Sequence, residues 1–113
     1  MIEICRKLSR TELKLTAIEM GKDICIILTG GEVHLGSVTV GSIGMDNETI
    51  KIKNHKEYVI TEMLGDIIKK EYSGNFVICC GIHFDNIIKE EISEITNMCC
   101  QMTVDLCSRL NRR

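Results

Sequence analysis

The fold is decided by the stretch Phe76-Val77-Ile78-Cys79-Cys80-Gly81-Ile82-His83-Phe84-Asp85-Asn86. Its first five residues are a solidly apolar run, which is typical of a buried strand. A long amphipathic segment follows the last residue, so residues 81–86 are predicted to be a strand-to-helix turn. The glycine permits a tight turn, and the polar side chains then lie beside the last strand carbonyls and the first helix N–H groups. This turn is the first candidate for a ligand site.

The segment after the turn predicts a long helix. Its apolar residues alternate between spacings of four and three from Ile88 to Leu110, which gives one apolar stripe about 23 residues long. At about 1.5 Å per residue, this helix is longer than a sheet of five short strands needs. We therefore expect its end to pack on a second subunit and the protein to be a homo-oligomer.

A shorter helix is predicted upstream of the turn. Asn54-His55-Lys56-Glu57 has the form of a capping box, in which Asn54 and Glu57 satisfy the first backbone N–H groups. Apolar residues then recur at helical spacing to about Tyr72. Gly65 lies within this helix, where it costs roughly 1 kcal/mol relative to Ala, and we interpret it as a site of close approach by a neighbour.

Four strands are predicted before the shorter helix, at residues 11–20, 24–28, 37–42 and 49–53. Short turns separate the first two and the last two, so each pair is expected to form an antiparallel hairpin. The glycines at 36, 41 and 44 indicate bulges. With the strand at 76–80, the predicted order is β-β-β-β-α-β-α. The sequence thus predicts an α+β fold, a largely antiparallel sheet of about five strands with two helices on one face.

Size and composition limit the function. The chain has 113 residues and a formal charge of −2, which predicts a single domain over 1–113 that does not bind nucleic acid. No signal peptide or membrane-spanning segment is recognised, so we expect a cytoplasmic protein without a membrane partner. The seven cysteines include two adjacent pairs and no CxxC, which favours thiols packed in a core in a reducing compartment.

All three histidines fall at junctions between predicted elements: His34 in the loop after residue 28, His55 before the shorter helix, and His83 in the turn. This placement predicts one shared pocket at one edge of the sheet. A metal site formed by His34, His55 and His83, with Asp85 beside them, is one interpretation, although their spacing is not that of a local metal motif. The alternative is that they are surface, capping or junction residues.

An anion site is a second interpretation of the same loops. Gly30 and Gly31 offer unhindered backbone N–H groups, and the predicted helix N-termini near Lys56 and near Ile87 offer positive dipole ends. A nucleotide-like phosphate would suit this arrangement. The loop matches neither GxGxxG nor GxxxxGK[ST], so an ordinary turn is the alternative. Nucleophilic catalysis by Cys79 or Cys80 has little support, because both fall within the predicted strand.

Three blocks of sequence resemble the LpdD-like family: residues 27–38 (ILTGGEVHLGSV), residues 54–57 (NHKE), and residues 81–87 (GIHFDNI) with Glu90-Glu91-Ile92. The resemblance covers about residues 11–110, with the blocks in the same order. Members are small proteins encoded beside UbiD-type hydroxyarylic acid decarboxylases and regarded as prenylated-flavin chaperones.

The resemblance implies a non-catalytic protein that carries prenylated FMN, or FMN, between the flavin prenyltransferase and the decarboxylase. It implies a cofactor site formed by Gly30, Gly31, His34, Gly36, His55, Lys56, Gly81, His83, Asp85 and Asn86. A divalent metal ion is compatible with such a site, since it can bridge imidazoles and phosphate oxygens. Two alternatives stay open at this point: a small metal-dependent enzyme that uses the three histidines, and a structural subunit of a decarboxylase complex.

Overall fold

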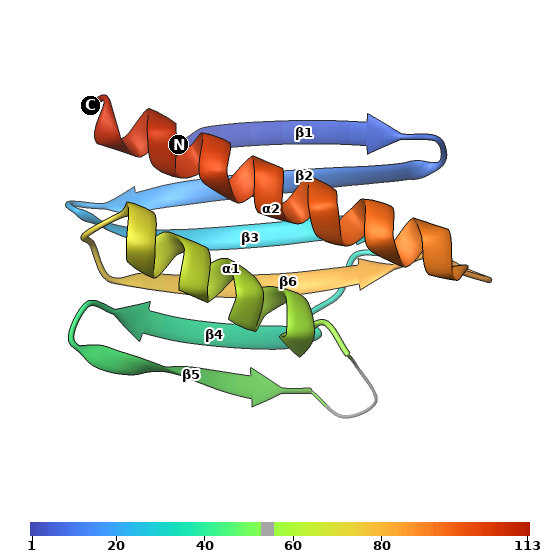
Figure 1. Cartoon of the computed structure of the whole chain (residues 1–113), viewed down its shortest axis with the longest axis horizontal. Coiled ribbons are helices and arrows are strands. Elements are labelled where there is room, and N and C mark those ends of the chain that lie inside the picture. Colours follow the sequence, from blue (N-terminus) through green and yellow to red (C-terminus); the bar gives the residue numbers. More distant parts are fainter. Residues whose placement is uncertain (53–55) are drawn as a thin grey trace.

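The central feature of the fold is a pair of parallel strands, β3 (Asp23–Gly31) and β6 (Phe76–His83). The computed structural model describes residues 1–52 and 56–113. Antiparallel hairpins flank the central pair (Figure 1). The remaining elements are β1 (Ile2–Leu8), β2 (Thr11–Met20), β4 (Ser37–Ser42), β5 (Met45–Lys51), α1 (Tyr58–Glu71) and α2 (Lys89–Asn111).

The sheet has six strands in the described residues, in the spatial order β1-β2-β3-β6-β4-β5. The α+β class and both predicted hairpins are confirmed. Two details of the prediction were wrong. An additional edge strand, β1, pairs with β2, and its Ile2 and Ile4 alternate with Glu3 and Cys5 as a strand requires. The sheet is also mixed, because β6 enters between β3 and β4 and runs parallel to β3.

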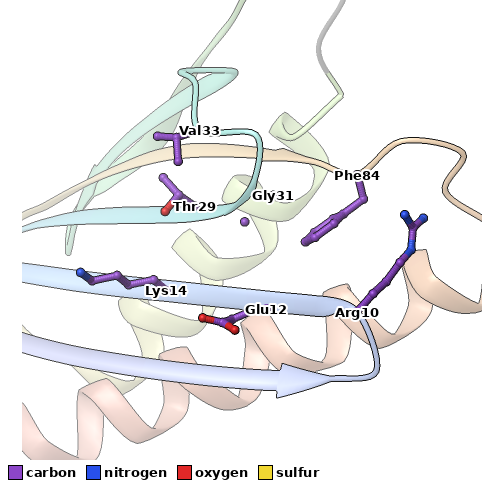
Figure 2. Close-up of a pocket in the computed structure, with 8 residues that line it drawn as sticks. Arg10, Glu12, Lys14, Thr29, Gly31, Val33 and Phe84 are labelled. Carbon is purple, nitrogen blue, oxygen red and sulfur yellow. The ribbon is translucent and has the colours of Figure 1, made fainter.

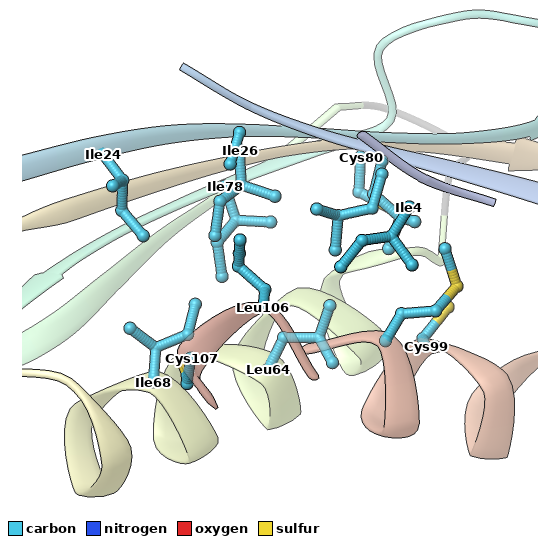
Figure 3. Packing of buried hydrophobic residues seen from close by; sticks show 14 of the residues in the cluster. Ile4, Ile24, Ile26, Leu64, Ile68, Ile78, Cys80, Cys99, Leu106 and Cys107 are labelled. Carbon is cyan, nitrogen blue, oxygen red and sulfur yellow. The ribbon is translucent and has the colours of Figure 1, made fainter. Parts of the chain in front are cut away.

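Both helices lie across the same face of the sheet (Figure 1). Period-two alternation directs one set of side chains from each central strand into the layer between sheet and helices. Figure 3 shows Ile26 and Ile78 of the sheet facing Leu64 and Leu106 of the helices. All four are at most 1% exposed. Neither helix in the described part of the chain is long and apolar enough to cross a bilayer.

The prediction that the end of α2 packs on a second subunit was wrong. Leu106 and Leu110 are buried within this chain, at 0% and 3% exposure, so the last turns need no second subunit to cover them. The additional strand β1 widens the surface on which α2 packs, since α2 contacts both β1 and β2. The exposed part of the predicted stripe lies at its start, where Ile88 is 54% and Ile92 50% exposed.

The glycines in the elements have identifiable neighbours. The register between β4 and β5 shifts between Val40 and Ser42, which confirms the bulge predicted at Gly41. A Cβ on Gly65 would lie 3.3 Å from Thr39 Cγ2 and 2.9 Å from Asn47 Nδ2. Gly65 thus brings α1 close to β4 and β5, as the sequence indicated.

The cysteines are free thiols in the structure, and those at 80, 99 and 107 belong to the core. Burial raises the pKa of Cys99 to about 12 and that of Cys107 to about 11. Burial also raises the pKa of Cys80 strongly. Because only the thiolate is a good nucleophile, these thiols act as small apolar side chains.

Candidate functional site

The candidate site lies where β3 and β6 end side by side. The loop 32–36 leaves β3, crosses the end of β6 and enters β4 on the other side. Two backbone hydrogen bonds hold the loop there: the Glu32 N–H donates to the His83 carbonyl at 3.0 Å, and the Gly36 N–H donates to the Cys80 carbonyl at 2.7 Å. A Cβ on Gly81 would collide with the His34 carbonyl oxygen, so this glycine permits the crossing. The predicted turn and loop are therefore in direct contact.

His34 and Glu57 form the most constrained polar pair of the site. His34 Nε2 lies 2.5 Å from Glu57 Oε2, and His34 Nδ1 lies 2.9 Å from the Glu32 carbonyl oxygen. The Glu57 side chain is only 9% exposed and that of His34 is 21% exposed. A carbonyl oxygen can only accept, so Nδ1 donates its proton to it. An imidazolium satisfies both contacts by donating to the carbonyl and to the carboxylate.

The electrostatics of His34 agree with that protonation state. The hydrogen bond to the Glu32 carbonyl raises the pKa of His34, and burial opposes it. The hydrogen bond and the charge of Glu57 raise the pKa further. A buried carboxylate requires a partner of this kind, because an unpaired buried charge is strongly unfavourable.

Glu57 was predicted to cap α1, and the structure gives it a different role. It is the N-cap residue of α1, but it makes no side-chain cap hydrogen bond. Its carboxylate is directed toward His34. Gly36 makes room for it, because a Cβ at position 36 would overlap the Glu57 carboxylate. Asn54 and His55, the other predicted members of the cap and of the histidine cluster, lie outside the described residues.

His83 lies beside this pair on the solvent side. The ring centroids of His34 and His83 are 6.5 Å apart with planes at 79°, an edge-on arrangement. His83 Nε2 lies 3.1 Å from Asp85 Oδ1, and the two side chains are 52% and 86% exposed. The structure therefore brings His34, His83 and Asp85 together, as the loop placement predicted. Asn86 continues the turn in a left-handed conformation, with φ +54°.

A largely apolar groove of about 450 Å³ opens beside His83. It lies between the first turns of α1 and α2, at the end of β6. Lys56, Glu57, His83 and Thr96 are its polar groups, and its apolar lining is Val59, Ile60, Ile82, Ile87, Ile92 and Ile95. Small-molecule sites are typically concave and mostly apolar, with a few polar groups that orient the ligand. This groove has that composition.

The groove explains the exposed start of the apolar stripe. The helical spacing of Ile88 and Ile92 predicted only a role in helix packing, yet Ile92 lines the groove at 50% exposure. Their spacing fits both roles, so periodicity could not separate them. Only the first turn of α2 is exposed here, since Ile95 and Cys99 further along the helix are 2% and 0% exposed.

A second pocket, of about 320 Å³, contains the predicted glycine pair (Figure 2). Glu12 and Lys14 of β2 lie along it with Thr29 of β3, and Phe84 and Arg10 lie at one end. Packing within the protein is sufficient to explain why both positions are glycine. A Cβ on Gly31, whose φ is +68°, would collide with the His83 carbonyl, and a Cβ on Gly30 would collide with the Leu13 side chain. The predicted cofactor residues are thus divided between two pockets.

The Glu91 carboxylate already occupies a position at the N-terminus of α2. Glu91 Oε1 accepts a hydrogen bond from the Ile88 N–H at 3.2 Å. The same carboxylate receives two hydrogen bonds from Arg10, at 2.6 and 2.9 Å, and Arg10 also donates to the Asp85 carbonyl. The hydrogen bond from Arg10 lowers the pKa of Glu91. An anion at this helix start would have to displace Glu91, so the start of α1, next to Lys56, is the better position.

The described residues contain no cluster of three or more His, Cys, Asp or Glu side chains arranged to hold a metal ion. Both ring nitrogens of His34 already face oxygen atoms of the protein. His83, in contrast to His34, has a half-exposed side chain.

Comparison with known proteins identifies the family. Residues 7–111 match the family described as the prenylated flavin chaperone LpdD-like domain. The chain belongs to this family. A solved structure described as a novel chaperone complex for yeast 20S proteasome assembly contains a similar chain, with a TM-score of 0.65 and 11% identity over 96% of each chain. At that identity the likeness concerns the fold alone. No curated protein matches the sequence.

Proposed function

We propose that this protein binds prenylated FMN and delivers it to a UbiD-type aromatic acid decarboxylase, without itself catalysing a reaction. The observation that carries the proposal is the apolar groove beside His83, in a chain of the LpdD-like family. A flavin combines a large apolar ring system with a charged phosphate tail. A groove lined with isoleucines and edged by an ammonium group and an imidazole is complementary to both parts.

The residues present fit such a cofactor in their donor chemistry. Ile60, Ile87 and Ile92 offer apolar surface to the ring system and its prenyl-derived ring. Lys56 and His83 are the groups that would hold the phosphate, since both can donate charge-assisted hydrogen bonds. When bound, the prenylated flavin supplies the chemistry that its decarboxylase uses. Here the groove would hold it and shield its apolar surface from water.

His34 and Glu57 are assigned a supporting role. Their ion pair fixes the loop 32–36 against the start of α1, which forms one wall of the groove. With both nitrogens engaged, His34 orients its neighbours while His83 meets the ligand. This arrangement gives no specific support to the alternative of a metal-dependent enzyme built on His34.

Titration of FMN and of prenylated FMN, followed by flavin fluorescence, tests the proposal. We expect saturable binding. His83→Ala should weaken it by about 1.5–3 kcal/mol, roughly ten- to a hundredfold, because a charge-assisted hydrogen bond is lost. The thermal unfolding temperature should change little, since the His83 side chain is 52% exposed. Absence of saturable binding of either flavin, with and without a divalent metal, would refute the proposal.

A matched pair of variants locates the site. Ile92→Glu introduces a charge into the groove and should weaken flavin binding at least tenfold, since a charge in an apolar site is poorly solvated. Val104→Glu is the control, because Val104 lies on the same helix at a similar exposure, 52% against 50%, but outside the groove. Equal affinities of the two variants would contradict the groove as the site.

Delivery is tested separately by reconstitution. The loaded protein is mixed with a UbiD-type decarboxylase purified without cofactor, and decarboxylation is followed over time. We expect faster activation than with the same concentration of free prenylated FMN. The carrier alone should not turn over any aromatic acid. Binding without faster activation would limit the function to storage of the cofactor.

A further inference from the structure

The outer face of α2 is uncharged along its middle part. From Ile95 to Val104 the sequence ITNMCCQMTV contains no charged residue, although 27% of the chain is charged. The side chains at positions 96, 97, 100, 101 and 104 are exposed or half-buried. The outward face of a surface helix normally carries its charged residues. Depletion of charge on such a face is characteristic of a protein interface.

These residues continue the line of the flavin groove along α2. Thr96 lines the groove itself. One turn further, Cys100 Sγ lies 3.2 Å from Met63 Sδ of α1, so the two helices meet there. Cys100 and Val104 then line a shallow hollow of about 480 Å³. We call Met63 with residues 96, 97, 100, 101 and 104 the helix-side surface, and no element of the described chain covers it (Figure 1).

Carboxylates border the helix-side surface. Glu62 precedes Met63 on α1, and Glu90 and Glu94 lie on the first turns of α2. None of these three glutamates forms an ion pair within residues 1–52 and 56–113. Lys89, at the start of α2, offsets part of their charge. A partner with basic residues around an uncharged centre therefore complements this surface.

We propose that the helix-side surface docks the protein that accepts the cofactor, through a face with an apolar centre and a basic rim. This inference rests on the proposed function, because the acceptor is the decarboxylase named there. Continuity with the groove supports this occupant. A partner seated on α2 beside Thr96 also reaches the mouth of the groove, so the apolar ring system can pass to it without entering water.

The size of the surface agrees with a transient partner. Residues 92–108 of α2 include the groove residue Ile92 and the hollow, and they span about 24 Å at about 1.5 Å per residue. Two helices side by side are about 20 Å wide. The footprint of roughly 500 Å² is smaller than the roughly 800 Å² that each partner contributes to a standard stable interface. A carrier has to leave its acceptor after each delivery, so a weak interface suits this role.

Biolayer interferometry tests the inference with the flavin-free chain and a UbiD-type decarboxylase purified without its cofactor. No flavin is present, so the result does not depend on the groove. Gln101→Glu changes an amide into a carboxylate of the same size, and Val104→Glu adds a charge at 52% exposure. Each should raise the dissociation constant of the complex at least tenfold, because the interface would then bury an unpaired carboxylate.

Ile43→Glu is the matched control. Ile43 is 60% exposed in the turn between β4 and β5, outside the helix layer, so this variant should bind the decarboxylase as the wild type does. Circular dichroism should show all three variants folded, since each position is exposed.

The carboxylates at the border have their own readout. The double variant Glu62→Gln with Glu94→Gln should lower the association rate several-fold at low salt. It should also make that rate less dependent on ionic strength, because attraction between exposed charges is screened by salt.

Three results would overturn the inference. The first is absence of binding between the wild-type chain and the decarboxylase. The second is an affinity that Gln101→Glu, Val104→Glu and Ile43→Glu change equally. The third is sedimentation in which Val104→Glu, but not Ile43→Glu, dissociates copies of this chain, which would assign the surface to self-association. Flavin titration decides the proposed function separately, because a chain that docks no decarboxylase can still bind flavin.

Discussion

The two faces of the sheet differ in what covers them, although their strands supply apolar side chains to both. On β3, Ile26 points toward the helices and is 1% exposed, whereas its neighbour Ile27 points away and is 39% exposed. Both are isoleucines of the same strand, so hydrophobicity alone does not show which face becomes the core. The difference comes from α1 and α2, which both return to the same side of the sheet.

The two faces also differ in the sites that they form. On the helix side, the first turns of α1 and α2 and the end of β6 line a groove, which is proposed to hold the flavin. On the open face, no helix of the described chain covers the strands, and side chains such as Ile27 and Ile50 stay exposed (Figure 1). A small ligand requires a concave site, whereas a protein partner requires area.

The largest expected effect is the difference in stability between variants on the two faces of the sheet. Ile26→Ala should lower the free energy of unfolding by about 2–5 kcal/mol, since it leaves a cavity in a packed core. Ile27→Ala should lower it by less than about 1 kcal/mol, because the Ile27 side chain is 39% exposed and its removal leaves no closed cavity. Urea unfolding monitored by circular dichroism measures both.

Equal losses for Ile26→Ala and Ile27→Ala would show that the open face is covered within the single chain.

An intermediate effect on stability is expected when alanine replaces either of two glycines that permit close packing. Gly81→Ala should cost about 1–3 kcal/mol or more, because the new Cβ meets the backbone carbonyl of His34, which can move only if the loop 32–36 moves. Gly65→Ala should be nearly neutral. Its Cβ meets the end of the flexible Asn47 side chain and a methyl group of Thr39, while alanine gains about 1 kcal/mol in helix propensity.

Equilibrium unfolding of the two glycine variants, together with flavin titration, measures this contrast. Gly81→Ala should also weaken flavin binding, because it displaces the loop that carries His34. A Gly65→Ala variant that loses more stability than Gly81→Ala would contradict the assigned contacts.

The smallest effect is the pH dependence that His34 contributes on the helix side. The pKa of His34 is raised in the folded state, first by the Glu32 carbonyl and further by Glu57. The folded pKa thus exceeds the ordinary value of 6.5. The stability from the imidazolium is complete below pH 6.5 and is lost as the pH rises through the raised pKa. The free energy of unfolding of the wild type should therefore fall above pH 6.5.

Glu57→Gln should reduce this dependence, because the neutral amide no longer favours the imidazolium. Among the described residues, Glu32 and His83 also lie near His34, and the variant leaves both unchanged. Urea unfolding at about pH 6 and about pH 9 measures the difference. A slope as steep in Glu57→Gln as in the wild type would assign the pH dependence to other groups.

Local sequence patterns determined much of the fold. Alternation and short turns predicted both hairpins, and helical periodicity predicted both helices. They did so because backbone geometry ties side-chain period to element type. The predictions for the glycines at 41 and 65 were also correct, because a glycine within a strand or a helix often marks a bulge or the close approach of a neighbour. The turn predicted at 81–86 begins later than expected, because β6 continues to His83. The closeness of His34 and His83 agrees with the prediction made from their placement at element junctions.

Tertiary structure alone decided the rest. Residues 2–8 became a strand because β2 offered an unpaired edge, and that strand packs against α2. The insertion of β6 between β3 and β4 made the sheet mixed and carried the loop 32–36 across its end. That crossing turned Glu57 from a predicted helix cap into the partner of His34, and it divided the predicted cofactor residues between two pockets. Such outcomes depend on which distant segments meet, and residue spacing along the chain does not encode those distances.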